Sequence, residues 1–95
     1  MEIIASAILF YIIGDEYPTI MCGKRHSDIL HKMYDMGIQY DKSSSIQGFM
    51  NYRGKFLNRT EAYLIAKQEG QLLPEAEKRY KGVEITELYS EDIFE

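Results

Sequence analysis

Residues 3–13, IIASAILFYII, are the stretch that decides the fold of this 95-residue chain. Isoleucine, phenylalanine and tyrosine favour β-strands, and apolarity that continues rather than alternates is typical of a strand covered on both faces. The stretch is too short to cross a bilayer, which takes about 20 such residues. Glu2 before it and the segment Gly14–Pro18 after it do not fit a signal peptide. We therefore expect a strand covered on both faces, with one covering layer supplied by another subunit.

Turn signals further along the chain predict two β-hairpins. Gly14–Pro18 separates the first strand from a second, and Asn51–Gly54 separates a third strand from a fourth. Glycine and proline mark turns, and strands joined by so few residues pair as hairpins. The three further strands are expected at Thr19–Cys22, Ile46–Met50 and Lys55–Leu57.

One helix is expected after each hairpin. The first begins with Ser27 as its N-cap and ends at Gly37. The second opens at Asn58–Thr60, where Asn58 and Glu61 have the spacing of a capping box, and runs to about Glu69. Apolar residues of the first helix lie near one face at helical spacing, which predicts that they are core. They are Ile29, Leu30, Met33, Tyr34 and Met36.

These elements predict an α+β fold. The expected architecture is a small antiparallel sheet of about four strands (two hairpins) with two α-helices, ordered β-β-α-β-β-α, and then an acidic C-terminal tail. The length allows a single domain over residues 1–95. Pro74–Lys78 indicates one more helical turn. Apolar residues that can anchor the tail are Leu88, Tyr89, Ile93 and Phe94.

The charge divides unevenly along the chain. Residues 1–68 carry a net charge of +1, and residues 69–95 carry −5. The total of −4 argues against general nucleic-acid binding, so we expect no direct binding to DNA. An acidic tail can solvate the chain, mimic a polyanion or dock on a basic groove. The solvating role is the preferred interpretation.

The sequence predicts neither a metal site nor an active site. His26 and His31 are spaced so that they project from different sides of a helix, and no further Cys or His pair completes a zinc site. Cys22 ends an apolar strand, where a thiol is usually buried and inert. A single cysteine also excludes a disulfide framework and fits a reducing compartment. We therefore expect a protein that is not an enzyme and holds no cofactor.

Anion binding is the strongest chemical signal. Gly23, Lys24, Arg25 and His26 directly precede the first helix, and Asn58 and Arg59 stand at the start of the second. Helix N-termini present free N–H groups and the positive end of a dipole, which favours anions and disfavours cations. The cations therefore need an anion beside them, and two such sites suit a ligand with two phosphates. Three environments remain open: an external ligand, a carboxylate of this or a neighbouring subunit, and plain solvated surface.

Aromatic residues add weak support for a nucleotide ligand. Bases stack on aromatic rings, although most of the eight tyrosines and four phenylalanines are expected in the core or in interfaces. Phe49 is the candidate for stacking, because its strand leads into the turn that holds Arg53. The predicted ligand-binding residues are therefore Gly23, Lys24, Arg25, His26, Phe49, Arg53, Asn58 and Arg59.

Three segments together give the chain a likeness to a phage protein family. MCGKRHSDILHKM, GFMNYRGKFLNRTEAYLIA and ELYSEDIF resemble the Thoeris anti-defence 1 family, whose members are signal sponges. The likeness spans roughly residues 3–70 plus the tail. It implies an α+β protein of the host cytoplasm that binds a cyclic ADP-ribose immune signal without cleaving it. It also implies dimers or hexamers, and in some members a separate site for cyclic oligonucleotides.

The leading functional hypothesis is a non-enzymatic module that sequesters a cyclic nucleotide-type signal, with a second copy of itself as partner and no membrane association. The alternative is a protein–protein inhibitor of the anti-CRISPR kind, in which the acidic tail mimics nucleic acid. A small hydrolase for the same signal is disfavoured, because no nucleophile, base and orienting group can be assembled from the spacing.

Overall fold

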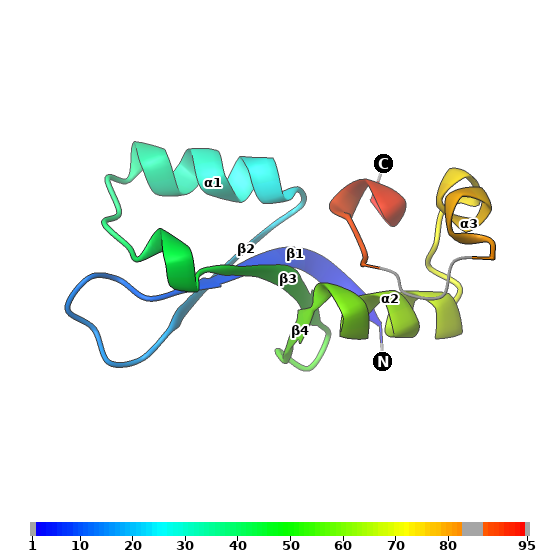
Figure 1. Ribbon diagram of the computed structural model, residues 1–95, viewed down its shortest axis with the longest axis horizontal. Helices are drawn as coiled ribbons and strands as arrows, with labels where there is room; N and C mark the ends of the chain where they lie inside the picture. The colour runs from blue at the N-terminus through cyan, green and yellow to red at the C-terminus, as the bar shows by residue number, and fades with distance from the viewer. Residues whose placement is uncertain (1, 83–86, 95) are drawn as a thin grey trace.

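A computed structural model describes residues 2–82 and 87–94 of the chain. Its four strands form one antiparallel sheet in the order β2-β1-β3-β4 (Figure 1). The strands are β1 (Ile3–Phe10), β2 (Thr19–Gly23), β3 (Ile46–Asn51) and β4 (Phe56–Asn58). The helices are α1 (His26–Asp35), α2 (Arg59–Gln68) and α3 (Pro74–Tyr80), with the short 3-10 helices η1 (Lys42–Ser44) and η2 (Ser90–Asp92). The α+β class, the two hairpins and the predicted element order are confirmed, and α3 adds a full helix where one turn was predicted. None of the helices in the described residues is long and apolar enough to span a membrane.

The central strand β1 is shorter than predicted, and this chain covers it on one face only. It pairs with β2 on one side and β3 on the other, and it ends at Phe10, after which Ile12 makes a single bridge to Tyr40. Ser6, Ile8 and Phe10 alternate along the strand and are buried on the helix side. The chain itself supplies one of the two predicted covering layers, because α1 and α2 both pack on that side of the sheet. The second layer, predicted from another subunit, stays a prediction.

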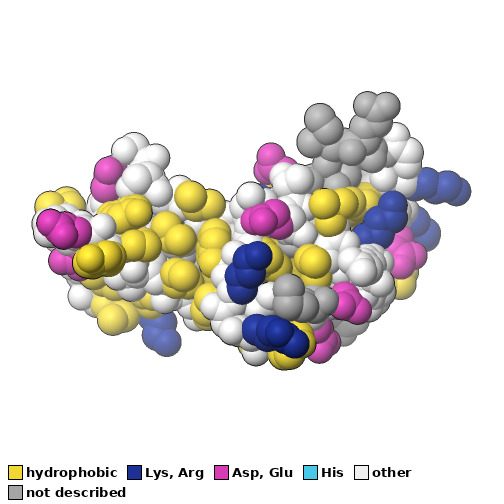
Figure 2. Space-filling view, turned by 90° about the horizontal axis from the view of Figure 1, so that it is seen from below, with side chains coloured by type: hydrophobic (Ala, Val, Ile, Leu, Met, Phe, Trp, Pro, Cys, Tyr) yellow, Lys and Arg dark blue, Asp and Glu magenta, His cyan; other side chains and the backbone are white. Residues whose placement is uncertain are grey.

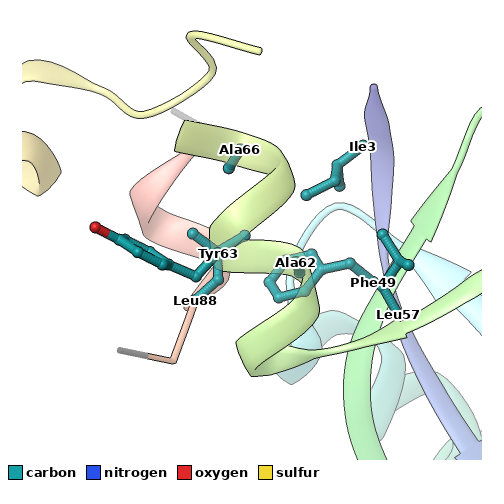
Figure 3. Close-up of a cluster of buried hydrophobic side chains, with 7 residues drawn as sticks. All are labelled: Ile3, Phe49, Leu57, Ala62, Tyr63, Ala66 and Leu88. Atoms are coloured by element: carbon teal, nitrogen blue, oxygen red, sulfur yellow. The ribbon is translucent and has the colours of Figure 1, made fainter. Parts of the chain in front are cut away.

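Two clusters of buried side chains share this covered face. The first joins the sheet to α2 and the C-terminal tail (Figure 3). Its buried members are Ile3, Phe49, Leu57, Ala62, Tyr63, Ala66 and Leu88. The second lies under α1 and consists of Ile8, Phe10, Ile29 and Met33. Because β1 contributes to both clusters, one strand links the two halves of an elongated molecule measuring 43 × 23 × 23 Å.

The helix boundaries confirm one predicted cap and correct another. Asn58 caps α2, and its side chain and that of Glu61 form the predicted capping box. Gly37 and Gly70 follow α1 and α2 with positive φ angles, as expected for helix stops. Ser27, however, lies inside α1: the N-cap is Arg25, whose side chain makes no capping hydrogen bond.

The predicted core face of α1 is only partly buried. Ile29 and Met33 are buried, whereas Leu30, Tyr34 and Met36 are exposed, so the prediction for these three is wrong. The sheet beneath α1 is narrow, and only one stripe of residues spaced four apart reaches it. The cysteine prediction is also wrong, since Cys22 is exposed.

Candidate functional site: two arginines at the C-terminal tail

The two basic helix starts predicted from the sequence meet at the C-terminal tail. The tail folds back over the covered side of the sheet, beside the first turn of α1 (Figure 1). Arg25 precedes α1 and Arg59 opens α2, and both contact tail residues. We call this group the arginine site. It consists of Arg25, Gln47, Arg59, Leu88, Tyr89 and Glu91.

Arg59 is held by three different groups. One terminal nitrogen of its guanidinium, Nη1, donates to the Leu88 carbonyl at 2.5 Å, and Nη2 donates to Oε1 of Gln47 at 2.6 Å. Its Cζ lies 4.6 Å from the centroid of the Tyr89 ring, within cation–π range. Arg59 therefore fastens the tail to β3 and α2, although none of these three contacts neutralises its charge.

Arg25 has a looser partner. Its Nη1 lies 4.0 Å from Oε2 of Glu91, and the two side chains are 30% and 61% exposed. Ion pairs of this kind contribute about 0–1 kcal/mol, because water screens them and ordering two long side chains costs entropy. The intramolecular carboxylate that the sequence left open is thus present, but it binds Arg25 weakly.

His26 directly follows Arg25 in the chain and is buried. Its Nε2 is 2.7 Å from the Gly48 carbonyl oxygen, and its ring meets the edge of Phe49 with centroids 5.1 Å apart. Burial lowers the pKa of His26 below its usual 6.5; Arg59 lowers it further, while the Gly48 hydrogen bond and Glu91 oppose the shift. A neutral ring that donates from Nε2 to Gly48 satisfies this geometry. His26 therefore positions the start of α1.

The remaining predicted residues have different surroundings. Gly23 is paired with Ser6 in the sheet, and Lys24 is exposed next to Arg25. Phe49 is fully buried, so its ring offers no free face for stacking in this arrangement. The Asn58 side chain is engaged in capping α2.

Arg53 lies outside the arginine site. It stands in the turn between β3 and β4, where its Nε donates to the Tyr52 hydroxyl at 3.0 Å. The neighbouring backbone N–H of Tyr52 donates to the carbonyl of Glu2, at the start of β1. The structure thus brings together Arg25, His26 and Arg59 and leaves Arg53 apart.

Four members of the site are not among the predicted ligand-binding residues: Gln47, Leu88, Tyr89 and Glu91. Gln47 was treated only as part of a strand, although a long polar side chain within IQGFM on the covered face needs a partner. Glu91 belongs to the tail whose preferred interpretation is solvation, although a tail carboxylate beside the cations was one of the environments left open. The tail is not simply a solvated segment, because Leu88 and Asp92 are buried.

A second polar group fixes the tail to α3. Oδ2 of the buried Asp92 accepts hydrogen bonds from the Tyr80 hydroxyl at 2.5 Å and from the Tyr89 backbone N–H at 2.8 Å. Its other oxygen pairs with Arg79. Burial raises the pKa of Tyr80, so its hydroxyl keeps its proton and remains a donor. This group holds η2 in place, next to the arginine site.

Among the described residues, no three His, Cys, Asp or Glu side chains gather as metal ligands. Cys22 lies opposite Ala7 in the register, on the sheet face away from His26. Burial raises the pKa of its thiol, so the thiolate form that acts as a nucleophile is disfavoured.

Residues 2–94 match the family of the phage T4 y16D protein. The chain belongs to this family. The match covers both basic helix starts and the tail, so the arginine site lies wholly within the family region. No curated protein and no solved structure matches the chain. The family description identifies a phage protein, and it states no ligand, partner or activity.

Proposed function

We propose that this phage protein binds and sequesters an anionic nucleotide signal at the arginine site without cleaving it. The signal class is cyclic ADP-ribose or a related cyclic nucleotide, and the place of action is the host cytoplasm. The observation that carries the proposal is the convergence of Arg25 and Arg59, from two separate helix starts, on one short tail segment. A diphosphate supplies the negative charge that the neighbouring Glu91 provides only in part.

The chemistry of binding follows from what each arginine now contacts. A phosphate can replace the Glu91 carboxylate at Arg25 and gains a bidentate partner with the geometry guanidinium favours. A second phosphate can replace the Leu88 carbonyl at Arg59. Because the N-cap residue of α1 makes no side-chain capping bond, the start of this helix is available to an anion. Tyr89, 46% exposed, offers a ring for a base in place of the buried Phe49.

The surroundings of the site support binding rather than cleavage. Its histidine is buried against a backbone carbonyl, and its carboxylate, Glu91, faces a cation rather than a nucleophile. A general base must reach the proton it removes. The anti-CRISPR alternative draws less support, since Asp92 is buried and Glu91 is paired, which leaves fewer free carboxylates for mimicry.

Calorimetric titration with cyclic ADP-ribose tests the proposal. We expect saturation at a fixed molar ratio, and intact ligand recovered after heat denaturation. Arg25→Ala should weaken binding by roughly tenfold to over a hundredfold, since a charge-assisted contact contributes about 1.5–3 kcal/mol. Its stability should change by no more than about 1 kcal/mol, because the Glu91 pair is weak.

Arg53→Ala is the matched control, because it removes an exposed arginine outside the site. The two variants should therefore differ in affinity and not in folding. Cleaved products, or equal affinities for both variants, would refute the proposal.

Glu91→Gln separates the two candidate functions. If ligand phosphate competes with the Glu91 carboxylate, removing that charge strengthens ligand binding several-fold. If the tail acts as a nucleic-acid mimic, the same change weakens inhibition of the host target. Deleting the whole tail is a poorer test, because it also removes the buried Leu88 and Asp92.

A further inference from the structure

We infer that the uncovered face of the sheet is a twofold interface with a second copy of this chain. The strand register assigns that face, because alternate residues on paired strands point the same way. We call it the open face. Its residues are Ala5, Ala7, Leu9, Ile20, Cys22, Ile46, Gly48, Met50, Phe56 and Asn58.

The open face is apolar apart from Asn58, whose side chain caps α2. It carries no charged residue, and Ile20 and Ile46 are 38% and 46% exposed. None of its side chains belongs to or packs against either buried cluster. Figure 2 shows this side of the molecule, where hydrophobic side chains gather over the sheet and charged side chains lie around them. A neutral apolar face with a charged rim matches the anatomy of a protein interface.

The exposed area of the chain points to the same conclusion. The molecule exposes 6307 Å², whereas a compact monomer of 11.1 kDa exposes about 5,700 Å². Its radius of gyration, 13.9 Å, also exceeds the value of about 12.4 Å expected for this length. The excess over the whole elongated molecule is about 600 Å², the same order as the roughly 800 Å² that each partner buries in a standard interface.

The surface shape of the open face allows it to pack against the same face of a second copy. Leu9 is opposite Ile20 on one side and Ile46 on the other, so these three form a ridge across the strands. The next row is lower: it holds the exposed Cys22 and the small Ala7, which its neighbours in this chain already bury. In a twofold packing the ridge of each copy lies over the lower row of the other, beside Cys22, at the usual sheet separation of about 10 Å. The arginine site lies on the opposite, helix-covered side, so both sites stay accessible.

Sedimentation velocity over a range of concentrations tests this interface. We expect the wild-type protein to form a dimer at micromolar concentration. Ile46→Glu should raise the dimer dissociation constant at least about 100-fold, because the twofold axis places two unpaired carboxylates in the buried interface. Leu64→Glu, an equivalent change on the exposed side of α2, should leave the dimer intact.

The exposed thiol of Cys22 gives a second measurement that can be made on the wild-type chain. Its rate of alkylation should fall as wild-type protein becomes dimeric, and it should stay high in Ile46→Glu. Ile20→Glu, on the edge strand, replaces Ile46→Glu if circular dichroism shows that the latter does not fold. A monomeric wild-type protein overturns the inference, whether the face binds a host protein or nothing. An assembly that Leu64→Glu disrupts and the open-face variants do not also overturns it.

Discussion

Gly48 is the residue at which sheet, histidine and open face meet. It pairs with Ala7 on one side and Asn58 on the other, and its carbonyl accepts from His26. A Cβ at this position would overlap the Leu57 carbonyl oxygen and lie 2.6 Å from Cζ of Phe56. The phenylalanine ring can move, but the paired backbone cannot move without loss of the β3–β4 ladder. Glycine is therefore required here by close approach rather than by backbone angle.

Gly48→Ala should destabilise the protein by about 1–3 kcal/mol, the usual cost of overpacking. Gly23→Ala is the control in strand β2, on the other side of β1: its Cβ would lie 3.0 Å from Cγ1 of Ile29, a contact that a shift of a few tenths of an ångström relieves. Urea unfolding of both variants gives the comparison. Equal losses would mean that the β3–β4 backbone is more adaptable than its pairing indicates.

The lowered pKa of His26 predicts that acid destabilises the protein. Burial holds its folded pKa below 6.5, while the unfolded chain titrates near about 6.5. Below that pH the unfolded state binds more protons, so stability is full above it and falls as the pH drops toward the folded pKa. The urea concentration at the midpoint of unfolding should therefore decrease as the pH is lowered from 7.5 to 5.5. His26→Gln keeps a donor for Gly48 and should lose less over this interval; an equal loss would place the titrating group elsewhere.

The C-terminal tail is the element on which both polar groups depend. Arg59 fastens its start at Leu88, and Arg79 and Tyr80 fasten its end at Asp92. Leu88 fills the cluster beneath α2. The tail is thus a structural part of the domain, and its position decides what the arginines can bind.

Asp92→Ala tests how firmly the end of the tail is held. It leaves the Tyr89 N–H without its acceptor and Arg79 without its carboxylate, while the Tyr80 hydroxyl keeps the Glu87 carbonyl as an acceptor. An unsatisfied buried donor costs about 1–3 kcal/mol. Glu91→Ala, which removes the adjacent carboxylate from a weak exposed pair, should cost no more than about 1 kcal/mol. Thermal unfolding compares them. If Asp92→Ala is as mild as Glu91→Ala, the packing of Leu88 and its contact with Arg59 hold the tail without Asp92.

Elements that depend on residues close together in the sequence could be predicted, whereas contacts between distant residues could not. The cap of α2 and the turn at Gly54 depend on residues three or four apart, and both were predicted. Arg59 and Leu88 are 29 positions apart, and no periodicity reports such a contact. The start of α1 was misplaced for the same reason: His26 joins the helix, and its ring packs on Phe49 and Gly48, contacts that only the folded sheet supplies.

At the scale of the molecule, two small clusters must act as one core. Neither is large, since a chain of this size buries about 60–65% of its unfolded surface. Strand β1 supplies Ile3 to one cluster and Ile8 and Phe10 to the other. The contact between His26 and Phe49 joins α1 to the half that holds α2. Loss of either cluster therefore removes support from the strand that the other needs.

Met33→Ala tests this coupling. The change empties space under α1 and should cost about 2–5 kcal/mol, whereas Leu64→Ala at an exposed position should stay within about 0.5 kcal/mol. If the domain unfolds as one unit, the slowest amides of α2 should exchange faster by the same factor as those of β1, at least about tenfold. Amide exchange by NMR measures α2 and β1 in one experiment. Faster exchange confined to α1 and β2 would show instead that the half of the molecule around α1 opens on its own while α2 and the tail stay folded.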